Sequence, residues 1–289
     1  MRCGLAGDAL LQITRAGGKK LEISSGRGTV LQSGDVVRAV CHSQRPAYLA
    51  FSGGIQIDPV LGSRSTYLRA RLGGLDGRTL QTGDKLVVGS LTAHEQNEDR
   101  SIDTGAAQQP ETESSVISVR VIPGPQHDHF TQQALDLFYS TSYTVSTQAD
   151  RMGLRLEGPA LSHGELGSNI PSDGIVPGAI QVPADGMPII LLSDAQTTGG
   201  YTKPCVVIRA DLPLLGRLVP GDRIRFVEAS PQEAQEQWKA GAEALNHKLA
   251  KITHRALAGT TDEARLRTVD LSSGLVSSQH QSQANACKI

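Results

Sequence analysis

A polar segment with two adjacent glycines holds the densest set of residues able to do chemistry. It reads Ser193-Asp194-Ala195-Gln196-Thr197-Thr198-Gly199-Gly200-Tyr201 and lies between two apolar runs, Pro188–Leu192 and one that begins at Cys205. Paired glycines let backbone N–H groups approach an anion, and Thr and Gln side chains add donors and acceptors. Asp194 is placed to move a proton or to orient a substrate N–H. A solvated hairpin with a Gly-Gly turn remains an alternative.

Two other segments place arginine where it could bind an anion. Arg151 and Arg155 lie four residues apart, and guanidinium groups suit carboxylate or phosphate recognition. Ser63-Arg64-Ser65-Thr66 combines hydroxyl groups with an arginine. Ordinary surface loops explain both patterns as well, and exposed arginines contribute little to stability.

Several motifs are absent from the sequence. There is no GxxxxGK[ST], which excludes a P-loop but not other modes of nucleotide binding. GxSxG is missing, and so is a biotin-acceptor Met-Lys pair. The four cysteines are scattered, without the close pairs of a zinc site. We therefore predict no metal ion and no covalently bound cofactor.

The charge balance and the apolar runs limit the class of protein. Lys and Arg number 28 against 29 Asp and Glu, so the net charge of −1 gives no support to a dedicated nucleic-acid-binding protein. No apolar run approaches the roughly 18 residues that span a bilayer, and the first residues lack the apolar core of a signal peptide. We predict a soluble, cytoplasmic protein that binds neither nucleic acid nor membrane.

Short strands joined by tight turns are the dominant pattern. Glycine accounts for 31 of 289 residues, and short β-branched runs alternate with Gly or Pro. A Gly-Asp turn that leads into a strand recurs at Leu31–Val37, Leu80–Leu86 and Leu218–Ile224. The repeat fits barrel corners in two halves of a duplicated fold, or chance.

The remaining patterns divide the chain. Residues 92–115 are acidic, with Ile102 as their only large aliphatic residue, and predict a linker. Ser230-Pro231-Gln232-Glu233 is a capping box that predicts a helix over 231–252. The prediction is a mainly β fold with a first β-barrel subdomain over 1–91, a second over 116–230, a C-terminal helix and a disordered tail over 253–289.

Seven segments, taken in order along residues 1–235, resemble one known family, the biotin-dependent carboxyltransferase subdomain A/B family, also called allophanate hydrolase subunit 2. The segments are 51–55, 60–67, 73–80, 150–156, 178–183, 194–201, and Asp211 with Pro220-Gly221-Asp222. The resemblance implies cyclophilin-like β-barrel subdomains. It also implies that the chain starts downstream of a segment that family members usually carry, so its first subdomain would be truncated.

The resemblance implies an enzyme component that works in a complex. Members with A- and B-type partner proteins carry out the ATP-dependent hydrolysis of 5-oxoproline to glutamate, and the ATP site of such a complex is left open here. One alternative is carboxyl transfer from carboxybiotin in a urea carboxylase or amidolyase. Another is a regulatory protein that binds a kinase inhibitor resembling the B-type protein. In either reaction a small amide develops negative charge on oxygen, which hydrogen-bond donors stabilise.

The family and the chemistry together give each candidate residue a role. Gln181, Thr197 and Thr198 would orient the amide, and Asp194 would manage a proton. Arg151 and Arg155 would neutralise a carboxylate. The other residues predicted to line the substrate site are Gln196, Gly199, Gly200, Tyr201, Ser63, Arg64, Ser65 and Thr66.

Overall fold

The computed structural model describes residues 1–89, 98–101, 116–250, 253–256 and 285–288. The chain forms two compact units, residues 1–105 with 246–289 and residues 106–245. Strands dominate the described part of both units, and a long helix follows the last strand of the second. The predicted mainly β fold with a β-barrel and a C-terminal helix is confirmed.

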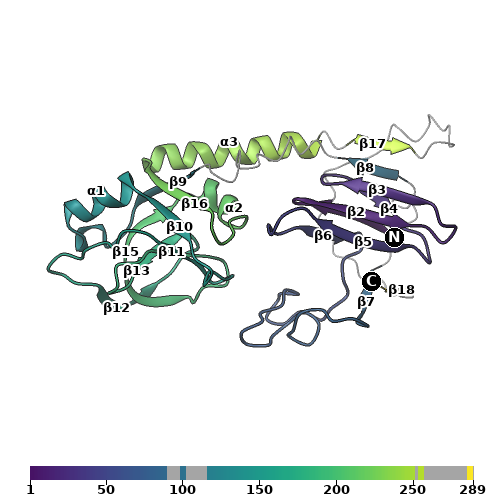
Figure 1. Cartoon of the computed structure of the whole chain (residues 1–289), viewed down its shortest axis with the longest axis horizontal. Coiled ribbons are helices and arrows are strands. Elements are labelled where there is room, and N and C mark those ends of the chain that lie inside the picture. The colour runs from purple at the N-terminus through teal and green to yellow at the C-terminus, as the bar shows by residue number, and fades with distance from the viewer. Residues whose placement is uncertain (90–97, 102–115, 251–252, 257–284, 289) are drawn as a thin grey trace. The chain divides into compact units, whose positions relative to one another are not determined.

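Seven strands of the second unit close into a barrel (Figure 1). Their order is β15-β13-β14-β11-β10-β16-β9, and pairing of β9 with β15 completes the ring. All neighbours are antiparallel except β16 and β9. The strands are β9 (Ile117–Pro123), β10 (Ser142–Val145), β11 (Gly153–Glu157), β13 (Ala179–Val182), β14 (Ile189–Leu191), β15 (Thr198–Val207) and β16 (Arg223–Glu228). An eighth strand, β12 (Asn169–Gly174), pairs with β15 outside the ring.

The barrel core follows from the alternation of apolar side chains along these strands. Ile180, Val182 and Phe226 point inward and are fully buried. Helix α1 (Gln132–Ser140) is capped at its N-terminus by Thr131, whose Oγ1 accepts the N–H of Ala134 at 3.1 Å. Its Phe138 stacks on Phe226, with ring centroids 4.3 Å apart, so α1 closes the core.

A short helical segment connects β15 to β16 and is tied back to the barrel. It comprises η3 (Arg209–Asp211) and α2 (Leu212–Leu215). A separate 3-10 turn, η2 (His127–His129), precedes α1. The Asp211 carboxylate accepts hydrogen bonds from the backbone N–H of Arg120 at 2.8 Å and from its guanidinium at 2.6 and 3.1 Å. Asp211 therefore anchors this connection to β9.

The described part of the first unit contains two three-stranded antiparallel sheets. One has the order β4-β1-β6 and the other β3-β2-β5. The strands are β1 (Arg2–Ala6), β2 (Ala9–Thr14), β3 (Lys20–Ser24), β4 (Gly28–Val30), β5 (Val36–Cys41) and β6 (Tyr48–Phe51). Cys3, Leu5, Leu11, Ile13 and Leu31 form its buried core.

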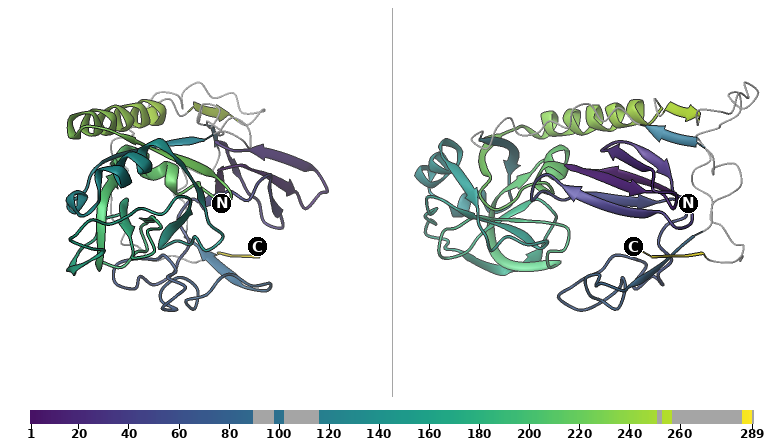
Figure 2. Two further views of the ribbon diagram at one scale, coloured as in Figure 1. Left: turned by 60° about the vertical axis from the view of Figure 1, so that its left-hand side comes forward. Right: turned by 45° about the vertical axis from the view of Figure 1, so that its right-hand side comes forward.

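A long segment without regular strands or helices, residues 52–84, joins β6 to β7 (Lys85–Val88), as Figure 2 shows. β7 pairs with β18 (Asn285–Lys288), and β8 (Glu98–Ser101) pairs with β17 (Thr253–Ala256). The rest of the predicted linker and tail lies outside the described residues.

The three predicted Gly-Asp turns share one geometry. In each, the Asp Oδ2 accepts the backbone N–H of the residue three positions earlier: Asp35 from Gln32 at 2.7 Å, Asp84 from Gln81 at 2.7 Å and Asp222 from Val219 at 2.9 Å. The preceding glycines have φ of 82°, 95° and 93°. The turns lead into β5, β7 and β16, as predicted.

The predicted C-terminal helix is α3 (Pro231–Ala250). Its capping box is formed, since Ser230 N–H donates to Glu233 Oε2 at 2.7 Å and Glu233 N–H donates to Ser230 Oγ at 3.2 Å. The guanidinium carbon of Arg209 lies over the Trp238 ring of α3, 4.2 Å from the ring centroid. Within the described part of the chain, no helix combines the length and apolar character needed to cross a membrane.

Candidate functional site

Gln181 is a buried polar residue on the outward face of β13. Its neighbours Ile180 and Val182 belong to the barrel core, so strand alternation turns Gln181 away from that core. Its exposed fraction is nevertheless 2%. The side chain of Gln196 reaches toward it, with Nε2 3.5 Å from Gln181 Oε1. Two residues of the predicted site therefore meet here.

The Gln181 amide occupies the space where a side chain at Gly199 would lie. A Cβ at Gly199 would lie 2.6 Å from Gln181 Nε2 and 2.7 Å from Ile175 Cδ1, so the ends of both side chains would have to shift. A side chain at this position therefore displaces the Gln181 amide.

The predicted boundaries of the glycine-containing loop are wrong. Strand β15 begins at Thr198 rather than at Cys205, and Gly199 and Gly200 lie inside it instead of forming a turn. Gly199 pairs with Asp173 of β12. The β12 sequence NIPSDG contains Pro and Gly and gives no strand pattern, so the partner that orders residues 198–201 was not visible locally.

The Gln181 amide nitrogen is chemically unsatisfied. Nε2 is covered by protein atoms and makes no hydrogen bond with any of the described residues. A side-chain amide carries two N–H donors there, and a buried donor without an acceptor costs about 1–3 kcal/mol. Such a donor is available to the oxygen of a ligand that reaches it.

Arg151 and Asp194 form an ion pair beside the loop. Arg151 Nε lies 2.9 Å from Asp194 Oδ2, and Asp194 N–H donates to the Arg151 carbonyl at 3.3 Å. The Arg151 side chain is 58% exposed and that of Asp194 22%. Arg155 is exposed on β11, and no hydrogen bond or ion pair joins its guanidinium to another described residue. The structure thus places one of the two predicted arginines at the loop.

The other loop residues lie nearer the surface. Thr197 and Thr198 are exposed, and the Thr197 carbonyl accepts the Ile175 N–H at 2.9 Å. Gly200 packs against the Ile170 carbonyl, and a Cβ added to Gly200 would lie 3.2 Å from that carbonyl oxygen. Tyr201 pairs with Asn169 and is exposed.

The predicted residues Ser63, Arg64, Ser65 and Thr66 belong to the first unit, where local contacts hold them. Ser63 exchanges backbone hydrogen bonds with Val60 at 2.9 and 3.0 Å, and its Oγ accepts the Ser65 N–H at 3.1 Å. Arg64 Nε donates to the Ile57 carbonyl at 2.9 Å. Thr66 packs so closely against Gly74 that a Cβ added to Gly74 would overlap the Thr66 Oγ1.

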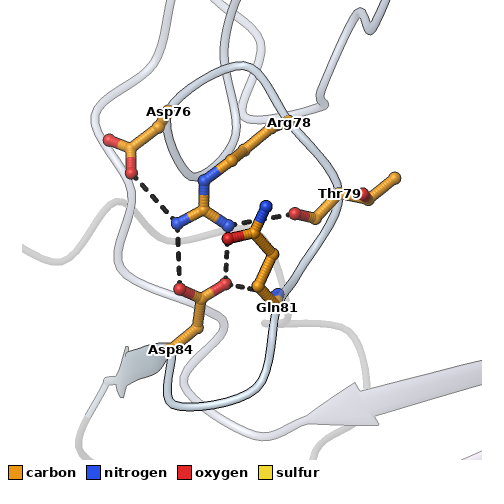
Figure 3. A network of polar contacts seen from close by, with 5 residues as sticks. All are labelled: Asp76, Arg78, Thr79, Gln81 and Asp84. Carbon is orange, nitrogen blue, oxygen red and sulfur yellow. Dashed lines mark hydrogen bonds and ion pairs between the residues drawn. The ribbon is translucent and has the colours of Figure 1, made fainter.

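A second polar network stabilises the same segment of the first unit (Figure 3). Arg78 donates to both carboxylate oxygens of Asp84 at 2.7 and 2.9 Å, and also to the Thr79 carbonyl at 3.0 Å. The Arg78 hydrogen bonds, together with the Gln81 N–H, lower the pKa of Asp84 to about 2. This network holds the turn before β7.

One residue was missed by sequence reasoning. Lys203 of β15 is 2% exposed, and its Nζ lies 3.2 Å from Asp173 Oδ2. The signal was a lysine inside an apolar strand, Thr202-Lys203-Pro204-Cys205, because lysine is almost never fully buried without a partner. Among the described residues, no three His, Cys, Asp or Glu side chains converge as metal ligands would.

Comparison with known families shows which family the chain belongs to. The family model described as carboxyltransferase domain, subdomain A and B, matches residues 5–228. The chain belongs to this family. The match ends at Glu228, the last residue of β16, so it includes the complete barrel and the loop with Asp194, while α3 follows it.

Two bacterial relatives are both named as the C component of 5-oxoprolinase. The chain is 38% identical over 193 residues to the protein of that name in Escherichia coli (strain K12), covering 67% of this chain and 59% of that protein. It is also 38% identical over 189 residues to the one in Haemophilus influenzae, covering 65% of this chain and 57% of that protein. The chain therefore spans less than two thirds of either relative.

A solved structure resembles the described fold. The K. lactis urea amidolyase crystal structure superposes with a TM-score of 0.72 and 26% identity, covering 87% of this chain and 16% of that one. The proteins that the chain resembles are thus named for 5-oxoprolinase and for urea amidolyase.

Proposed function

We propose that this chain is the C-type component of a 5-oxoprolinase complex, which hydrolyses 5-oxoproline to glutamate with A- and B-type proteins and ATP. The observation that carries the proposal is the unsatisfied Gln181 Nε2, held against Gly199 and beside the Asp194 loop. The 38% identity to the two bacterial proteins named for 5-oxoprolinase supports this substrate over others. A cytoplasmic location follows from the need for ATP.

The proposed chemistry uses the donor at Gln181 and the carboxylate at Asp194. Water adds to the lactam carbonyl carbon, the C–N bond breaks, and the ring nitrogen takes a proton. Negative charge develops on the carbonyl oxygen, and Gln181 Nε2 donates a hydrogen bond to it. Asp194 accepts the proton of the attacking water and passes it toward the ring nitrogen.

The neighbouring residues hold these two groups and orient the substrate. Arg151 holds the Asp194 carboxylate through the 2.9 Å ion pair. Thr197 and Thr198, on the exposed side, supply hydroxyl groups that orient the amide. Gln196 donates to Gln181 Oε1 and so helps to hold the Gln181 amide in place. ATP hydrolysis by the assembled complex drives the reaction.

The test is reconstitution of the complex. This chain is purified together with A- and B-type proteins of the same organism, and glutamate is measured with 5-oxoproline and ATP present. Activity is expected only when all three are mixed, and Asp194→Asn is expected to lower kcat about 100- to 10,000-fold with the complex still assembled. Full activity without this chain, or with Asp194→Asn, contradicts the proposal.

A second candidate is carboxyl transfer from carboxybiotin to urea. The structural similarity to urea amidolyase supports it. The same preparation, supplied with a carboxylated biotin carrier and urea, would then consume carboxybiotin, whereas ring opening would leave it intact. A regulatory role in binding a kinase inhibitor of the B type predicts a stable pair with the B-type protein and no turnover of 5-oxoproline after the A-type protein is added.

A further inference from the structure

Lys203 is a buried ammonium group with spare hydrogen-bond donors. Its Nζ is covered by protein atoms, and among the described residues its ionic contact is with Asp173 Oδ2, at 3.2 Å. An ammonium group carries three donors and no acceptor. Burying an ammonium group whose hydrogen-bonding capacity is only partly used costs free energy.

The partner of Lys203 is a surface carboxylate. The Asp173 side chain is 52% exposed, whereas that of Lys203 is 3% exposed. Asp173 Oδ1 accepts the backbone N–H of Gly174 at 2.7 Å. This hydrogen bond, followed by the contact with Lys203, lowers the pKa of Asp173, so the carboxylate is charged at neutral pH. A negative group thus covers Lys203 from the solvent side.

Lys203 and Gln181 lie on the same side of the sheet. In the β13–β15 ladder Ile180 pairs with Cys205 and Val182 with Thr202, so the register shift leaves Lys203 and Pro204 opposite Gln181. Ile180, Val182 and Cys205 face the core, which turns Gln181 and the shifted residues outward.

Two further contacts connect the donors. Asp173, which contacts Lys203, pairs with Gly199, and Gly199 packs against Gln181 Nε2. Two buried nitrogen donors that lack acceptors among the described residues therefore share one set of neighbours. One donor is neutral and the other is positively charged.

We propose that Lys203 Nζ and Gln181 Nε2 form a two-point site for a small amide that carries its own carboxylate, with Asp173 holding the carboxylate position until the substrate displaces it. Gln181 donates to the amide carbonyl and Lys203 pairs with the substrate carboxylate. The proposal rests on the proposed function and explains why the site would select amides that carry a carboxylate. 5-Oxoproline has both groups, whereas urea and 2-pyrrolidone have only the amide.

The test compares substrates that differ in the carboxylate. In the reconstituted complex, Lys203→Met is expected to raise KM for 5-oxoproline about 100-fold, because a buried charge loses its partner. Its activity on 2-pyrrolidone should stay near the wild-type value, so the preference for 5-oxoproline falls. Asp173→Asn removes the internal competitor and is expected to lower KM for 5-oxoproline. Lys239→Met, an exposed position on α3, is the matched control.

Several outcomes overturn the proposal. Wild-type KM and unchanged substrate preference in Lys203→Met do so directly. If that variant does not fold, Lys203→Arg and Asp173→Asn decide, since the proposal requires altered KM for 5-oxoproline and unaltered KM for 2-pyrrolidone in both.

Binding separates this inference from the proposed function. If the wild-type complex opens no 5-oxoproline, the proposed function fails, and the site is judged by NMR titration of the purified chain. Shifts at Lys203 and Gln181 with 5-oxoproline, but not with 2-pyrrolidone, support a carboxylate-amide site without the activity. No shifts with either compound end both proposals.

Discussion

The Gln181 region of the second unit and the Arg78 region of the first are both polar and contain glycines, yet they differ in how their donors are used. Arg78 donates to two oxygens of Asp84 and to the Thr79 carbonyl, and Asp84 also accepts from Gln81. Gln181 Nε2 has no acceptor among the described residues. A satisfied network stabilises its own loop, whereas an unsatisfied donor is available to a ligand.

The strongest test of this difference removes the space beside Gln181. Gly199→Val places side-chain atoms where Gln181 Nε2 and Ile175 Cδ1 lie, so the amide must move. We expect activity of the complex to fall below detection, with a stability cost of about 1–3 kcal/mol from overpacking. Activity is followed by glutamate release and stability by urea unfolding.

Gly174→Ala is the control for that substitution. A Cβ at Gly174 meets nothing within 4 Å. Its activity should match the wild type, and an equal loss in both variants would show that β12 and β15 tolerate no added side chain anywhere.

Gln181→Leu separates function from stability. The substitution removes a buried donor that has no acceptor among the described residues and keeps a similar volume, so the free energy of unfolding should stay the same or rise. Activity should fall about 100- to 1000-fold, as when a hydrogen-bond donor to a developing oxyanion is lost. A large loss of stability would show instead that Gln181 is a structural residue.

Arg151→Gln tests the ion pair at the loop. Because both partners are partly exposed, the change in unfolding free energy should be below about 1 kcal/mol. Asp194 would lose its positioning partner, and kcat should fall roughly 10- to 100-fold with little change in KM. A rise in KM with unchanged kcat would assign Arg151 to substrate binding instead.

Asp84→Asn in the first unit should have the smallest effect on activity and a distinct effect on acid stability. The pKa of Asp84 in the folded protein is about 2, below its ordinary value of 3.8. Its contribution to stability is therefore present above about pH 4 and lost as the pH falls toward 2. The wild type should lose stability of the first unit over this range.

The Asn variant should begin less stable at neutral pH and show a flatter pH dependence, measured by circular dichroism between pH 2 and pH 7. Asp76→Asn is the control, because its contact with Arg78 is longer, at 3.4 Å, and the Asp76 side chain is exposed. An Asn variant with the acid profile of the wild type would remove the assigned role of the Arg78–Asp84 pair.

Local features were predictable because their hydrogen bonds join residues close in sequence. The Gly-Asp turn before β16 needs only Val219 and Asp222, and the α3 cap needs only Ser230 and Glu233. The apolar run at Pro188–Leu192 also predicted a strand, and β14 (Ile189–Leu191) lies within it. The candidate site was predicted in part: Gln181 and Gln196 meet, and Arg151 reaches Asp194, whereas Arg155 is exposed without such a contact.

Sequence alone thus determined the mainly β class, the family, the turns that start strands and the segment that carries Asp194. Only the tertiary structure decided that Gln181 is buried away from the core, that Gly199 lies in a strand, and that Lys203 contacts Asp173. The physical reason is pairing between distant parts of the chain. The β12–β15 ladder joins Asp173 to Gly199, and the β9–β15 ladder joins Pro123 to Cys205, and no local pattern specifies such partners.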